Sequence, residues 1–60
     1  MASVVLDVNT TDDLEYSNSG NFETVIVSTR NDNDIKDDVI VEKMKLVGFS
    51  KIIIVKTILQ

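Results

Sequence analysis

Residues 35–47, IKDDVIVEKMKLV, decide between two folds for this chain. Read as a helix, this segment places Ile35, Val39 and Leu46 on one side, although two lysines interrupt that stripe. Read as a strand over residues 39–47, it mixes apolar and charged side chains on both faces. Neither pattern is clean, so periodicity alone does not assign the segment.

The two ends of this segment favour the helix. Asp37 and Asp38 stand near its start, where the helix dipole stabilises negative charge, and lysines stand near its end. Asp32 or Asp34 is suited to accept hydrogen bonds from the amides of the first turn. Gly48 follows at the position where helices commonly end on a left-handed residue. These signals predict a helix.

Three further segments read as strands. Residues 51–59, KIIIVKTIL, are mostly apolar on both faces of the predicted strand. Residues 22–29, FETVIVST, carry apolar side chains on both faces at their centre, which is typical of a central strand. Residues 3–8, SVVLDV, form a shorter strand whose second face bears Asp7 and is expected to meet water.

The sequence therefore predicts one small α+β domain over residues 1–60, with a three-stranded sheet and one helix in β-β-α-β order and a polar loop at 9–21. If residues 22–59 form a βαβ unit, its strands are parallel and its crossover is right-handed. The alternative is an all-β fold in which residues 39–59 form a C-terminal hairpin. One helix covers one face of such a sheet and leaves the other uncovered.

Composition points to association with another chain. A 60-residue domain is marginally stable alone, and small domains usually gain stability from disulfides, a metal or a partner. The chain has no Cys and no His, so it lacks disulfides, thiolate metal sites and the commonest general base. Self-association or incorporation into a larger assembly is the remaining source of stability.

Charge and hydropathy exclude several classes of partner. Ten acidic residues against six basic ones give a net charge of -4, which argues against nucleic-acid binding. The longest apolar run is far shorter than a membrane span. The start, MASVVLDVN, has no basic n-region or apolar core, so we expect no secretion signal. Residues 1–29 hold five acids and no base, and residues 43–60 hold four lysines and no acid, which indicates either charge balance within one fold or head-to-tail association.

No catalytic, cofactor or metal site is expected. The spacing of Asn31, Asn33 and Glu42 resembles part of an EF-hand loop, but its sixth position is Lys36 rather than Gly, and helix capping explains the neighbouring acids. The carboxylates around Asp12 are typical of a solvated loop. Without His, no Ser has a recognisable activating base. The sequence therefore predicts a protein that is not an enzyme and binds no small-molecule substrate.

Five apolar residues are the candidates for contact with a partner protein. Leu14 and Tyr16 are the large apolar side chains of the polar loop. Ile52, Ile54 and Ile58 share one face of the last strand, which either lies at the centre of the sheet or meets another chain by face packing or strand addition.

The leading functional hypothesis is a non-enzymatic structural or interaction protein that acts as an oligomer or as a subunit of a larger assembly. Abundant Asn, Asp, Ile, Lys and Val indicate an AT-rich coding sequence, which fits a virus or phage. Capsid decoration, connector and accessory proteins of the virion or host cytoplasm are of this kind. The alternative is an acidic inhibitory or regulatory protein that binds a basic site on a target protein.

Overall fold

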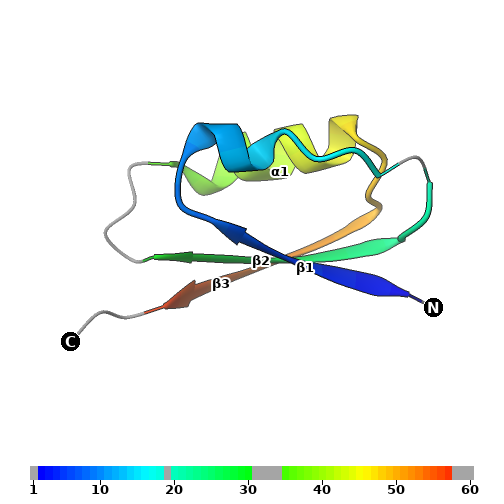
Figure 1. The fold of residues 1–60 in the computed structure, drawn as a ribbon, viewed down its shortest axis with the longest axis horizontal. Coiled ribbons are helices and arrows are strands. Elements are labelled where there is room, and N and C mark those ends of the chain that lie inside the picture. The colour runs from blue at the N-terminus through cyan, green and yellow to red at the C-terminus, as the bar shows by residue number, and fades with distance from the viewer. Residues whose placement is uncertain (1, 19, 31–34, 58–60) are drawn as a thin grey trace.

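The computed structural model describes residues 2–18, 20–30 and 35–57, which form three strands, one α-helix and one 3-10 turn (Figure 1). The elements follow in the order β1 (Ser3–Val8), η1 (Thr11–Leu14), β2 (Thr24–Arg30), α1 (Asp37–Leu46) and β3 (Lys51–Thr57). The predicted combination of one three-stranded sheet with one helix is confirmed. The end of the predicted last strand, residues 58–59, lies outside the described residues.

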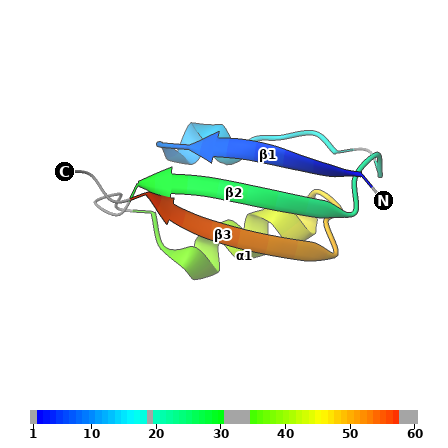
Figure 2. The same ribbon diagram turned by 90° about the horizontal axis from the view of Figure 1, so that it is seen from below.

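The sheet is entirely parallel and its order follows the chain, β1-β2-β3. β2 is central, as its two apolar faces predict. Both connections pass over the same face of the sheet, and both crossovers are right-handed (Figure 2). The alternative all-β fold is wrong, because the segment that it assigns to the first hairpin strand is α1 and β3 pairs with β2 in parallel.

Helix α1 begins later than predicted. Its N-cap is Lys36, with no side-chain hydrogen bond to the first turn, and Asp37 and Asp38 supply the negative charge there. The predicted caps, Asp32 and Asp34, lie outside the described residues. Lys56 of β3 reaches the first turn as well, with its Nζ 3.1 Å from Oδ1 of Asp37. The start of the helix is thus fixed through charge rather than through a capping hydroxyl or amide.

The end of α1 is a Schellman motif. The N–H of Gly48 donates to the carbonyl of Lys45, and the N–H of Phe49 donates to the carbonyl of Met44, each at 3.1 Å. Gly48 has φ +105°, which confirms the predicted left-handed end. Met44 and Phe49 are both buried, so the hydrophobic contact that usually accompanies this motif joins the helix end to the core.

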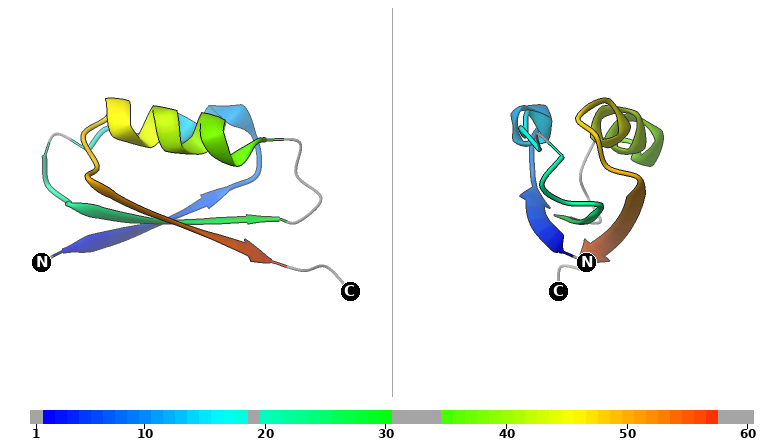
Figure 3. Two further views of the ribbon diagram at one scale, coloured as in Figure 1. Left: turned by 180° about the vertical axis from the view of Figure 1, so that it is seen from behind. Right: turned by 90° about the vertical axis from the view of Figure 1, so that its right-hand side faces the viewer.

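The core lies between one face of the sheet and the layer formed by α1 and η1 (Figure 3). Alternate residues of the strands point into it, which produces the buried positions of β1 and β2. The buried apolar side chains come from β1, η1, β2, α1 and the turn before β3: Val8, Leu14, Val25, Val27, Ile40, Met44 and Phe49. The single helix therefore covers one face only, as expected from the element count.

The polar loop is more ordered than its composition suggests. Its first part is η1, and the Asp13 carboxylate accepts hydrogen bonds from the backbone N–H groups of Asn9 and Thr10 at 2.8 and 3.0 Å. Tyr16 stacks on Phe49, with ring centroids 5.9 Å apart and an interplanar angle of 25°. The loop is thereby attached to both the end of β1 and the end of the helix.

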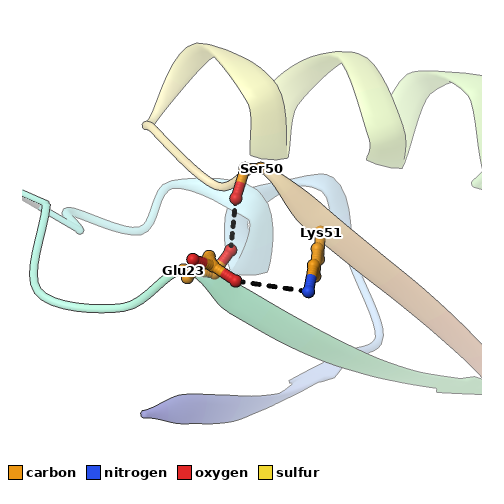
Figure 4. A network of polar contacts seen from close by, with 3 residues as sticks. All are labelled: Glu23, Ser50 and Lys51. Atoms are coloured by element: carbon orange, nitrogen blue, oxygen red, sulfur yellow. Dashed lines mark hydrogen bonds and ion pairs between the residues drawn. The ribbon is translucent and has the colours of Figure 1, made fainter. Parts of the chain in front are cut away.

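Three residues hold the start of β3 beside the start of β2 (Figure 4). The carbonyl of Glu23 accepts from the backbone N–H groups of Ser50 and Lys51 at 3.0 and 3.1 Å, and from the Ser50 hydroxyl at 3.3 Å. The Lys51 ammonium lies 3.4 Å from a Glu23 carboxylate oxygen. These contacts fix the register in which Thr24 lies opposite Lys51.

Candidate functional site

The face of the sheet turned away from α1 carries a row of apolar side chains. Val5 lies opposite Ile26, and Ile26 lies opposite Ile53, so the three form one line across all strands. Val5 is 63% exposed and Ile53 49% exposed, while Ile26 in the central strand is half-buried. This face, called the outer face here, consists of the following side chains: Ser3, Val5, Asp7, Thr24, Ile26, Ser28, Arg30, Lys51, Ile53, Val55 and Thr57.

Polar rows flank the apolar row on both sides. Toward the strand starts lie Ser3, Thr24 and Lys51, and toward the strand ends lie Asp7, Ser28 and Val55. Val55 is 47% exposed and extends the apolar surface along β3. Asp7 and Lys51 therefore occupy diagonally opposite corners around the apolar row, with opposite charges.

An uncovered parallel sheet face is unusual for physical reasons. Parallel sheets occur almost always with both faces covered, and their strands are rich in β-branched residues on both faces. β3 has this composition, but only its inner face, with Ile52 and Ile54, packs against the core. Within the part of the chain that the structure describes, no element lies below the sheet (Figure 3). Exposed β-branched side chains in a contiguous row are typical of a contact surface for another chain.

The four predicted contact residues that the structure describes lie elsewhere than on this outer face. Leu14 is 3% exposed and belongs to the core, and Tyr16 is half-buried against Phe49. Ile52 and Ile54 are half-buried on the face that α1 covers. Ile58 lies outside the described residues. The open face of β3 is thus the opposite one from that expected for a partner.

Sequence reasoning missed the outer-face residues because β3 is apolar on both sides. Its inner face contains Lys56, whose side chain extends from the strand end toward Asp37. A charged residue therefore lies on the face that the helix covers, so charge alone does not identify the open face. The usable signal was in the neighbouring strands. Asp7 on β1 shares a face with Val5, and parallel pairing carries that face through Ile26 to Ile53.

The buried polar side-chain atoms of the described residues have hydrogen-bond partners within the chain. No buried side-chain nitrogen or oxygen in this part of the protein lacks a hydrogen-bond partner. The backbone N–H groups of Asn9 and then Thr10 hold the pKa of the Asp13 carboxyl below its ordinary value. Asp13 thereby accepts the hydrogen bonds of the backbone amides that follow β1. These amides lie at the carboxyl end of the strand, which is the edge where parallel sheets often bind ligands. Residues 2–18, 20–30 and 35–57 also contain no group of three acidic side chains placed to hold a metal ion.

A shallow hollow lies between η1 and α1, on the opposite side of the molecule from the outer face. Its volume is about 260 Å³, and Lys43 of the helix lies among carboxylates of the turn. The lining residues are Thr11, Asp12, Leu14, Glu15, Val39 and Lys43. The hollow is thus lined by two carboxylates and one ammonium group.

No family model, curated protein or solved structure matches the chain. Among the described residues, no helix has the length and hydropathy required to cross a membrane.

Proposed function

We propose that this protein is a non-enzymatic interaction module whose outer face is covered by another polypeptide in an oligomer or a larger assembly. The observation that carries this proposal is the exposed row of Val5, Ile26 and Ile53 on a sheet that is parallel throughout. Covering such a row removes β-branched side chains from water, at about 25 cal/mol per Å² of apolar area.

The small size of the chain supports the same proposal. The core contains seven buried apolar side chains among the described residues, all on one side of the sheet. A domain of this length buries about 60% of the surface that its unfolded chain exposes, so additional burial raises its stability appreciably. The composition offers no disulfide as a substitute, because the sequence has no Cys.

A decoration, connector or accessory subunit of a viral particle is one role in which this face is covered by neighbouring protein. The alternative role, an acidic inhibitor of a basic target site, would require a continuous acidic surface. The hollow between η1 and α1 is lined by Lys43 together with Asp12 and Glu15, so its lining is mixed in charge rather than uniformly acidic.

The test is the mass of the protein in extracts of the cells that naturally make it, followed with an antibody through size-exclusion chromatography. The wild-type chain should elute well above its monomer mass of 6.7 kDa. Ile53→Asp places a carboxylate on the outer face and should elute as a folded monomer, whereas Lys45→Asp, on an exposed position of α1, should elute with the wild type. A wild-type protein that elutes as a monomer in the extract would overturn the proposal.

A further inference from the structure

We infer that the occupant of the outer face is a second copy of this chain, bound face to face about a two-fold axis that runs along the Val5–Ile26–Ile53 row. This inference rests on the proposed function and adds the identity and orientation of the partner. Symmetric dimers are the commonest soluble oligomers, and their interfaces must be complementary to themselves. The outer face meets that requirement in one particular orientation.

An axis along the apolar row makes each of its three residues face its own counterpart. Val5, Ile26 and Ile53 of one copy then form a six-residue apolar centre with those of the other. The strands of the two sheets run in opposite directions, and sheets packed in this way lie about 10 Å apart with a relative rotation of about 30°. The branched side chains of both sheets fill the space between them.

The same axis brings opposite charges together. It places the row of Asp7, Ser28 and Val55 of each copy over the row of Ser3, Thr24 and Lys51 of the other. Asp7 of one copy and Lys51 of the other then lie in the same pair of facing rows. Measured across the strands, the two residues are about 10 Å apart, since they are two strands apart and neighbouring strands are about 4.8 Å apart. Asp7 lies over Ser3 and Lys51 over Val55, so the opposite charges attract across two strands, while the Lys51 ammonium also lies 3.4 Å from the Glu23 carboxylate of its own copy. Two such pairs form per dimer, related by the symmetry.

The other aligned two-fold arrangement is less favourable. An axis parallel to the strands would place β1 over β3 of the second copy, and Asp7 would then face Val55. In that arrangement the two copies of Asp7 would lie about 10 Å apart across the strands, and so would the two copies of Lys51, which brings like charges closer together than opposite ones. Lys51 would face Ser3 and would lie two rows away from any carboxylate of the outer face. The charges on this surface thus select the antiparallel arrangement.

The size of the face sets the expected strength. Three strands and four rows span about 15 by 20 Å, so the total buried area is below about 1,200 Å². Interfaces of that size are typical of weak and transient contacts. We therefore expect a reversible dimer with a Kd on the order of 100 μM rather than an obligate one. Such a dimer is populated at the high local concentration of an assembly.

Sedimentation equilibrium of the purified full chain tests this inference. Concentrations from about 10 μM to 1 mM extend from below to above the expected Kd. The wild type should change from monomer to dimer, and Ile53→Asp should remain a folded monomer by circular dichroism. Asp7→Lys and Lys51→Asp should each weaken association about three- to tenfold, because attraction becomes repulsion in both symmetric pairs. The double variant D7K/K51D should restore association close to the wild-type level.

Lys45→Asp is the matched control, since it makes the same change of charge at an exposed position of α1, on the other side of the sheet from the outer face. It should leave the dimer unchanged. Three results would overturn the inference: a wild type that stays monomeric at 1 mM, near ten times the expected Kd, a dimer insensitive to Ile53→Asp, or a double variant no tighter than the single ones. A purified monomer that still elutes as a large species from cell extract would leave the proposed function standing with a different partner. A monomer in both experiments would reject both.

Discussion

At the scale of single residues, Asn18 closes the end of the polar loop. Its side-chain amide donates to the carbonyl of Phe22 at 2.9 Å and accepts from the N–H of Phe22 at 3.0 Å, and the residue is only 1% exposed. We expect Asn18→Ala to lower the free energy of unfolding by about 1–3 kcal/mol, because two backbone groups lose their partner in a buried place. Urea unfolding measures this change.

Asn21→Ala is the control for that experiment. Asn21 is exposed, and only its backbone N–H contacts Asn18, through the Asn18 carbonyl at 3.0 Å. Its substitution should leave the urea midpoint nearly unchanged. Equal midpoints for Asn18→Ala and the wild type would show that the loop finds other partners for Phe22.

Asp13 gives the fold a dependence on acid pH. Its pKa is lowered by the N–H groups of Asn9 and Thr10, so the folded state favours the charged carboxylate more than the unfolded state does. This contribution is complete above the unfolded pKa of the group and is lost as the pH falls through its folded pKa. The effect is small because the carboxylate is fully exposed. Stability should therefore decline less on acidification in Asp13→Asn than in the wild type, as measured by thermal unfolding at several pH values.

An NMR titration of the Asp13 carboxyl carbon checks the same point directly. Its midpoint should lie below the ordinary value of an aspartate in an unfolded peptide. A midpoint at that ordinary value would contradict the capping role.

At the scale of elements, the turn from α1 into β3 depends on the backbone of Gly48. Its φ of +105° is unfavourable for residues with a Cβ, while an added Cβ would meet only the Asn18 side-chain nitrogen at an ordinary 3.5 Å. The cost of Gly48→Ala is therefore conformational, and we expect about 1–3 kcal/mol by thermal unfolding. Gly20→Ala is the comparison, because Gly20 has φ +75° and open space around it. It should cost less, since its φ lies nearer the left-handed region that other residues occasionally adopt.

The elements themselves were largely predictable from sequence, and the reasons are local. The alternation of Val4, Leu6 and Val8 gives the bounds of β1, and the charge order with Gly48 gives the type and end of α1. The start of α1 was placed two residues early, because no side chain caps it. η1 was not predicted, because it lies within a polar loop. The hydrogen bonds of Asp13 there follow no pattern that the sequence displays.

The candidate site was less predictable because it depends on which face of the sheet the helix packs against. Ile52 and Ile53 are equivalent in a sequence that is apolar on both sides of β3, and only packing distinguishes them. Asn18 is likewise indistinguishable by composition from Asn9 or Asn21. Burial of a particular residue in a short chain is a property of the assembled layers, so it follows from the three-dimensional arrangement alone.

At the scale of the whole molecule, stability and association are coupled through the outer face. A ligand that binds only the folded state raises its stability, and here the ligand is another polypeptide, a second copy in the arrangement inferred above. We expect the Tm of the wild type to rise with protein concentration by about 4–8 °C once the concentration reaches about ten times the Kd. Differential scanning calorimetry over a hundredfold concentration range measures this shift.

A pair of adjacent substitutions in β3 separates the two faces. Ile54→Ala removes a half-buried side chain from the core side and should lower Tm at every concentration, with a loss of about 2 kcal/mol or more. Ile53→Ala removes an exposed side chain and should leave Tm at low concentration nearly unchanged while abolishing its rise with concentration. The opposite result, with Ile53→Ala destabilising the dilute monomer and Ile54→Ala affecting only the concentration dependence, would mean that the helix covers the other face of the sheet. Because the two residues are neighbours with the same side chain, the comparison isolates the face from every other property of the strand.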